Sequence, residues 1–192
     1  MKKSYDSSRA FFKTIALKMN LNENDTVCDI AAGWGVSISS LANYLPKNTI
    51  YYEEDILKKA CKRSQFKAAF KMFHSKANIN NFRFSIGTKN SIPYQSEQFK
   101  NVVLFISIHE FEEKEKMLKE VERIMRKDGK LYVLENTYDS IPVTDPNCKF
   151  QYLSKQSLYS IIENAGLKIG FDSIMSDKTQ KSCSRFLICA KQ

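Results

Sequence analysis

The segment from Thr26 to Gly35 holds the residues best suited to bind a ligand through the backbone. Its apolar first half, which contains the acid Asp29, is typical of a buried parallel strand. Four small residues follow: Ala31, Ala32, Gly33 and Gly35. The glycines among them leave backbone N–H groups accessible to a ligand. Residues 36–45 carry apolar side chains at helical spacing, so these N–H groups would lie at a helix N-terminus, where anions are favoured. The segment therefore predicts a strand, a tight ligand-binding turn and a helix.

Three consecutive acids, Glu53, Glu54 and Asp55, follow a second expected strand that begins at Thr49. Because three carboxylates cannot all be buried, we expect them at the rim of the crevice where parallel α/β sheets bind ligands. A carboxylate about 20 residues beyond a glycine turn can accept hydrogen bonds from both hydroxyls of a ribose. The strand pattern does not choose between Glu54 and Asp55 for this role, and the other acids are expected to cap the next helix.

The glycine turn lacks the third glycine of the dinucleotide-binding pattern G-x-G-x-x-G, because Ile38 stands there. An acid four residues before a G-x-G pair instead resembles the first motif of class I S-adenosylmethionine-dependent methyltransferases, with Ala31 in place of that family's usual glycine. The resemblance implies that the turn lies against the methionyl part of S-adenosylmethionine. It also implies that Asp29 orients the turn and the ammonium group, and that Glu54 or Asp55 holds the ribose.

Further stretches extend the resemblance and depart from it at two positions. After a third expected strand, 82–86, Thr88 stands where the family usually has an acid that contacts the adenine amino group. The apolar run 102–106 is similar to the family's fourth strand. The resemblance implies that its last residue, Ile106, contacts the cofactor. Lys100 replaces the acid that is customary just before this run. The stretch from Lys127 to Glu135, a basic helix end followed by Gly129 and an apolar strand, also resembles the family's pattern.

His109 is the candidate general base. It follows the run 102–106 and would therefore lie at the carboxyl end of a central strand, where open α/β sheets carry their sites. An imidazole can take the proton of a hydroxyl or amine acceptor near neutral pH. The turn N/D-P-P-Y/F of nucleic-acid amino-methyltransferases is absent at this strand end, which counts against base N-methylation.

The resemblance implies a Rossmann-like α/β fold: a seven-stranded, mostly parallel sheet with an antiparallel last strand and helices on both faces. An N-terminal helical segment, 1–24, is expected to pack on an S-adenosylmethionine-binding domain, 25–192. Expected strands start at Thr26 and Thr49 and cover 82–86, 102–106, 131–135, 167–174 and 183–190, the last two joined by a polar turn. Expected helices cover 7–19, the segment after Asp55, 112–127 and a segment capped by Ser154, and Gly129 is expected at positive φ.

Length and composition limit the number of domains and the cellular compartment. The 192 residues suit one α/β domain, and no apolar stretch is long enough to cross a membrane. Five cysteines form no C-x-x-C pair and have no histidine at metal-ligand spacing, so we expect free thiols, no metal and a cytoplasmic protein.

Seven basic residues lie between Lys58 and Lys76 without an acid among them, and the whole chain has a net charge of +9. This cluster supports an alternative, an RNA or protein methyltransferase that binds its substrate through a basic helix at 58–76. A methyltransferase-like binding protein without catalysis is a further alternative, since Thr88 and Lys100 both depart from the family pattern. The preferred hypothesis is an enzyme, a monomer or homodimer, that methylates a small-molecule acceptor.

Overall fold

The computed structural model describes residues 2–175 and 183–192. The chain divides into two compact units, the first ending at Ile86 and the second beginning at Gly87. The expected separation of residues 1–24 from 25–192 stays a prediction.

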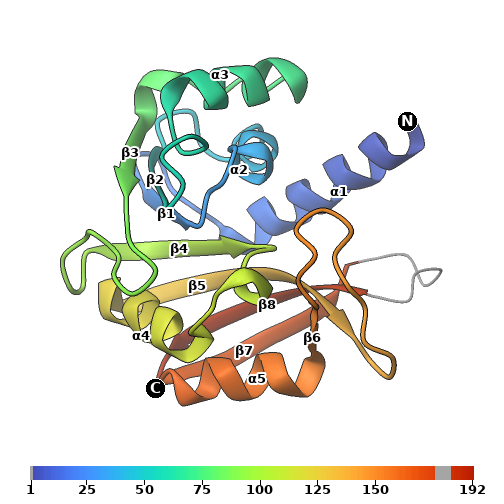
Figure 1. Cartoon of the computed structure of the whole chain (residues 1–192). Helices are drawn as coiled ribbons and strands as arrows, with labels where there is room; N and C mark the ends of the chain where they lie inside the picture. The colour runs from blue at the N-terminus through green and yellow to red at the C-terminus, as the bar shows by residue number, and fades with distance from the viewer. Residues whose placement is uncertain (1, 176–182) are drawn as a thin grey trace. The chain divides into compact units, whose positions relative to one another are not determined.

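The first unit is built on three parallel strands in the order β3-β2-β1 (Figure 1). Asp29 pairs with Glu53 in the register of β1 and β2, and Ile30 pairs with Glu54. In chain order the elements are α1 (Lys2–Met19), β1 (Thr26–Ile30), α2 (Val36–Leu41), β2 (Ile50–Asp55), α3 (Arg63–Met72), a 3-10 turn (Ile79–Asn81) and β3 (Phe82–Ile86).

Aromatic side chains fill the core between α3 and the strands of the first unit. The Phe82 ring stacks on Tyr51 with 4.3 Å between centroids, and Phe70 meets it edge-on at 5.1 Å. Phe66, fully buried, packs against Phe82 and Phe84. This packing uses one side of α3, so its basic side chains face away from the core.

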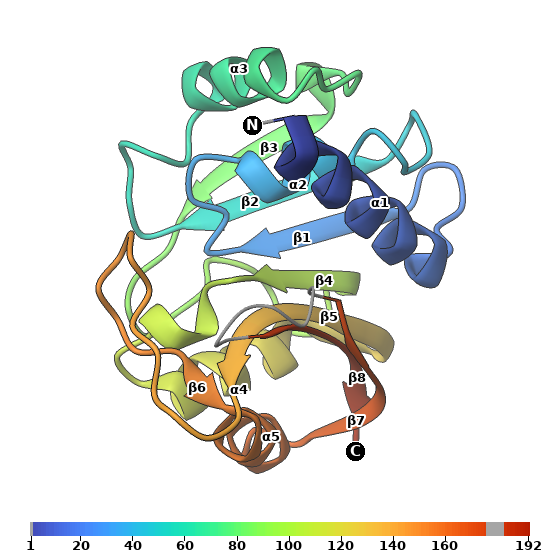
Figure 2. The same ribbon diagram turned by 90° about the vertical axis from the view of Figure 1, so that its right-hand side faces the viewer.

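The second unit continues with strands in the order β4-β5-β8-β7, and the short β6 pairs with the end of β5 (Figure 2). β4 and β5 are parallel, whereas β8 is antiparallel to both of its neighbours, as expected for the last strand. Its elements are β4 (Phe99–Phe105), a 3-10 turn (Ile108–Glu110), α4 (Lys114–Ile124), β5 (Met125–Tyr138), β6 (Leu153–Ser154), α5 (Lys155–Asn164), β7 (Leu167–Ile174) and β8 (Cys183–Lys191).

All seven expected strands are present, and β6 is an addition. The Ser154 side chain caps α5 by accepting a hydrogen bond from the Ser157 N–H, as predicted, and Gly166 ends the helix at φ 84°. The polar turn expected between β7 and β8 lies outside the described residues.

Gly129 does not have the expected positive φ. The helix before it stops at Ile124, and β5 already begins at Met125, so Gly129 lies inside a strand rather than in a turn. A Cβ there would come within 2.9 Å of the Arg126 carbonyl oxygen and 3.1 Å of the Phe99 carbonyl oxygen. The glycine is required by close backbone packing.

Candidate functional site

The turn after β1 is held in a left-handed backbone conformation at three positions. Ala31, Gly33 and Gly35 have φ values of 55°, 54° and 75°. A Cβ at Gly35 would meet the Phe66 ring at 2.7 Å, so this glycine lets the turn approach α3. A Cβ at Gly33 would meet nothing within 4 Å, so at this position the bare backbone faces open space. This is the geometry expected of a turn that receives a ligand.

The carboxylate of Asp55 is bound to the same turn. Its Oδ2 accepts a hydrogen bond from the Gly33 N–H at 2.8 Å, and its Oδ1 accepts one from the Leu57 N–H at 2.7 Å. The Ala32 N–H donates to the Glu54 carbonyl oxygen at 2.9 Å, which joins the turn to β2 a second time. The structure thus brings together all the first-unit residues expected to bind the cofactor: Asp29, Ala31, Ala32, Gly33, Gly35, Glu54 and Asp55.

The expectation that the three acids lie at an exposed rim is wrong. β2 extends through them, and Glu53, Glu54 and Asp55 are 0%, 3% and 6% exposed. Nor does any of them cap α3, whose N-cap is Lys62 without a side-chain hydrogen bond. Asp55 can be buried because its carboxylate accepts hydrogen bonds from two backbone N–H groups.

Glu53 is compensated differently, by keeping its proton. Burial raises the pKa of Asp29 to about 8, although the neighbouring Glu53 lowers it in part. Burial, and then the neighbouring Asp29, raise the pKa of Glu53 well above its ordinary value. Neither carboxyl oxygen of Glu53 has a hydrogen-bond partner among the described residues. Burial of these two neighbouring acids therefore favours their neutral forms.

Large apolar side chains are exposed beside the turn. Trp34 lies between the two glycines and is 53% exposed, and Val36 follows at 45%. Ile56 and Leu57, directly after Asp55, are 45% and 58% exposed. Their position next to a carboxylate that can accept from hydroxyls fits a ligand with both a sugar and an apolar or aromatic part.

The two remaining expected cofactor residues belong to the second unit. Thr88 lies in an exposed turn, where its hydroxyl accepts a hydrogen bond from the Asn90 N–H at 3.3 Å. Ile106 directly follows β4 with φ 54°, a strained conformation for a β-branched residue, and its N–H donates to the Leu134 carbonyl oxygen. Both roles stay predictions.

His109 is buried, and both of its ring nitrogens have partners. Nδ1 lies 2.9 Å from the Glu135 carboxylate, and Nε2 lies 3.4 Å from the Cys148 sulfur. Burial alone would lower the pKa of His109, but Glu135, followed by Glu110 and Asp145, raises it above its ordinary value. His109 was predicted from the sequence, but Cys148 was not, because it lies 39 residues away in a loop with no periodicity.

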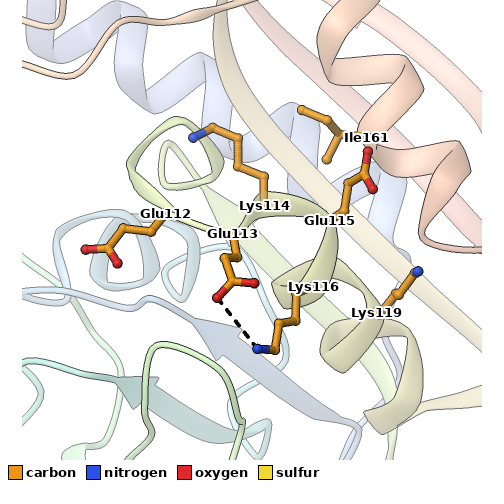
Figure 3. Close-up of a pocket in the computed structure, with 7 residues that line it drawn as sticks. All are labelled: Glu112, Glu113, Lys114, Glu115, Lys116, Lys119 and Ile161. Atoms are coloured by element: carbon orange, nitrogen blue, oxygen red, sulfur yellow. Dashed lines mark ion pairs between the residues drawn. The ribbon is translucent and has the colours of Figure 1, made fainter.

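A surface hollow of about 570 Å³ lies at the start of α4 in the second unit (Figure 3). Its lining is charged apart from one apolar residue, Ile161, and Glu113 and Lys116 form an ion pair at 3.6 Å. None of the residues expected to bind cofactor or acceptor lines it. In addition, no helix within residues 2–175 and 183–192 has the length and apolar character needed to cross a membrane.

Two features define a protein of the Rossmann-like methyltransferase class. They are the strand order of each unit and the glycine turn, whose Gly33 N–H is bound to the Asp55 carboxylate. The profile of the family described as "Methyltransferase domain" matches residues 21–166, and the chain belongs to this family.

Solved structures share the fold at low sequence identity. A S-adenosylmethionine-dependent methyltransferase from Aquifex aeolicus has a TM-score of 0.71 and 18% identity, over 93% of this chain and 88% of its own. A geranyl diphosphate methyltransferase in complex with S-adenosylmethionine has a TM-score of 0.71 and 8% identity, over 96% and 85%. The family match confirms the predicted methyltransferase family, and the solved structures confirm the predicted fold class.

A curated relative is matched over a short segment only. The uncharacterized methyltransferase YcgJ of Bacillus subtilis (strain 168) is 27% identical over 73 residues, which are 38% of this chain and 29% of the relative. The match therefore covers less than a third of that relative's length.

Proposed function

We propose that the protein transfers a methyl group from S-adenosylmethionine to a small-molecule acceptor. The observation that carries the proposal is the geometry of the glycine turn at Gly33. This residue has a left-handed backbone conformation and faces open space, and its N–H donates a hydrogen bond to the Asp55 carboxylate. The sulfonium of the cofactor supplies an electrophilic methyl group, so the task of the protein is to position the two reactants and exclude water.

Each residue of the turn has a distinct part in this proposal. Gly33 would allow the methionyl part to approach the backbone, and Asp29 would orient the turn and the ammonium group. Asp55 is our choice for the ribose, because each of its oxygens accepts one backbone hydrogen bond and retains capacity for a hydroxyl. Glu54 is the other candidate, from the same strand end.

The small-molecule acceptor is supported by the name of one structural neighbour, geranyl diphosphate methyltransferase, whose substrate is a small metabolite. If the acceptor is a hydroxyl or an amine, His109 could take its proton only through Nε2, because Nδ1 is bound to Glu135. That role requires Cys148 to move away from Nε2.

Calorimetric titration with S-adenosylmethionine and its demethylated product tests the cofactor site. We expect wild-type binding, a loss of about 10–100-fold in Asp55→Asn, where hydrogen bonds to a charged acceptor are weakened, and a smaller loss in Glu54→Gln. A larger loss in Glu54→Gln would transfer the ribose role to Glu54. Absence of wild-type binding would contradict the proposal and favour a binding protein without catalysis.

A matched pair of glycine variants separates ligand contact from backbone strain. Gly33 and Gly166 both have positive φ, and a Cβ at either would meet nothing within 4 Å. Ala at either position should therefore cost about 1 kcal/mol in stability. Only Gly33→Ala should also weaken cofactor binding, because its methyl group would occupy the space proposed for the ligand. Once binding is established, formation of the demethylated product in a screen of small acceptors identifies the substrate class.

Methylation of RNA or protein is the second candidate. The observation that favours it is that all seven basic side chains around α3 are exposed: Lys58, Lys59, Lys62, Arg63, Lys67, Lys71 and Lys76. Such a surface attracts polyanions by its charge, whether or not they are substrates.

We also propose a cytoplasmic location. The five cysteines are free thiols, and free thiols persist in reducing compartments.

A further inference from the structure

We propose that His109, Glu110 and Cys148 form a binding site for a divalent transition metal ion of the zinc type. One ligand atom from each residue, the imidazole Nε2, a carboxylate oxygen and the thiol sulfur, lies within 4.8 Å of the other two. The Nε2–Sγ distance is 3.4 Å, and the distance from Nε2 to Glu110 Oε1 is 3.9 Å. The three residues come from the turn after β4 and from the loop between β5 and β6, within the second unit.

These separations suit tetrahedral coordination. Zinc binds sulfur at about 2.3 Å, histidine nitrogen at about 2.0–2.1 Å and carboxylate oxygen at about 2.0–2.2 Å, which places neighbouring ligand atoms about 3.4–3.6 Å apart. The histidine and cysteine atoms already have this spacing. The Glu110 carboxylate has to move closer to the other two atoms, and its side chain is 47% exposed.

The histidine is oriented as metal-bound histidines are. Nδ1 lies 2.9 Å from the fully buried Glu135 carboxylate, and Nε2 faces the Cys148 sulfur. The Glu135 carboxylate is itself fixed by the backbone N–H groups of His109 and Asn136. A carboxylate behind a histidine sets its tautomer and increases its basicity as a ligand.

The loop that carries Cys148 is shaped by Asp145. Its Oδ1 accepts hydrogen bonds from the N–H groups of Asn147 and Cys148, and its Oδ2 accepts the Tyr152 hydroxyl. Asp145 Oδ2 also lies 3.9 Å from His109 Nε2. One imidazole is thus surrounded by three carboxylates and a thiol, a concentration of negative charge that a divalent cation would neutralise.

The mixed ligand set points to the class of metal. A thiolate with an imidazole suits zinc and its neighbours in the transition series, whereas magnesium and calcium prefer oxygen alone. Three protein ligands leave a fourth position for water or for an oxygen or sulfur atom of a small molecule, as in catalytic rather than structural zinc sites. The site goes beyond the proposed methyl transfer and does not depend on it, and a metal ion bound at Nε2 would exclude His109 as the general base.

Cobalt is the probe, because thiolate–Co²⁺ charge transfer and the intensity of the ligand-field bands report sulfur ligation and tetrahedral geometry. The full chain, stripped of metal by a chelator, should bind one Co²⁺ with both signals, and Zn²⁺ should displace it. Cys148→Ser should abolish the charge-transfer band, and Glu110→Gln should weaken binding at least about 10-fold.

Two control variants change the same chemistry outside the cluster. Cys183→Ser removes another half-buried thiol, and Glu112→Gln removes an exposed carboxylate near Glu110. Both should bind cobalt as the wild type does. Absence of tetrahedral bands, or an unchanged charge-transfer band in Cys148→Ser, would overturn the proposal.

A second measurement on the wild-type protein keeps the proposal testable if Cys148→Ser fails to fold. Alkylation of Cys148, followed by mass spectrometry, should be slowed at least about 10-fold by Zn²⁺. Alkylation that is fast and unaffected by Zn²⁺ would instead indicate a reactive thiol beside His109, and would overturn the metal site.

Discussion

The raised pKa values of the buried Asp29 and Glu53 make stability depend on pH at the level of single residues. In the folded state the pKa of Asp29 rises from an ordinary 3.8 to about 8, and that of Glu53 also rises. The folded protein then binds more protons than the unfolded chain between pH ~4 and ~8, so its stability falls as pH increases through this range.

Glu53→Gln should remove much of this dependence. The glutamine side chain is close in shape to a protonated Glu53, but it cannot ionise. We expect the variant to match the wild type near pH 5 and to be about 1–3 kcal/mol more stable at pH 8. Thermal unfolding across the pH range measures this, with the exposed Glu23→Gln as control. A difference that is the same at every pH would show that the pKa of Glu53 is not raised in the folded protein.

Ala31 carries strain that its family's usual glycine would not. Its φ of 55° costs an L-residue about 1–2 kcal/mol, whereas Gly loses about 0.5–1 kcal/mol of entropy on folding. Ala31→Gly should therefore be neutral or stabilising by up to about 1 kcal/mol. Ala68→Gly, in the exposed interior of α3, should cost about 0.8–1 kcal/mol. Chemical denaturation of both variants compares them, and equal losses would show that strain at Ala31 is negligible.

The sequence identified the residues of the cofactor turn because they are local. Asp29, Gly33 and Gly35 lie within seven positions, and their spacing alone indicates a bare backbone beside an acid. The pairing of Glu53 with Asp29 could not be predicted, because it depends on the register of two strands. The approach of Cys148 to His109 depends on the path of a loop without periodicity.

At the scale of elements, Gly129 of β5 lies close to the backbone of β4. Gly129→Ala should destabilise the protein by about 1–3 kcal/mol, because its Cβ would meet two backbone carbonyl oxygens that cannot rotate away. Gly170→Ala, in β7, is the control, since its nearest neighbour would lie at 3.8 Å. Denaturant midpoints measure both. A loss in Gly129→Ala no larger than that in Gly170→Ala would contradict the steric account.

Strand existence was predictable and strand ends were not. Apolar runs mark the centres of β1, β3 and β7, whose predicted and observed bounds agree. β2 runs on through three acids, and β5 begins six residues before the expected Leu131, because backbone pairing with neighbours continues beyond the apolar run. Hydrophobic periodicity reports which side chains are buried among apolar neighbours, not where hydrogen-bonded pairing stops.

At the scale of the whole molecule, the charge of +9 predicts weak RNA binding, steeply dependent on salt and independent of sequence, without methyl transfer to the RNA. The double variant Lys67→Glu/Lys71→Glu reverses two exposed charges of α3. It should lower the affinity for RNA at least about 10-fold and make that affinity less dependent on salt. Cofactor binding should not change. Lys116→Glu/Lys119→Glu on α4, where acids are interspersed, is the control. Fluorescence anisotropy at several salt concentrations measures affinity. Sequence-selective binding that survives high salt, with methylated RNA as product, would favour the second candidate function over the small-molecule acceptor.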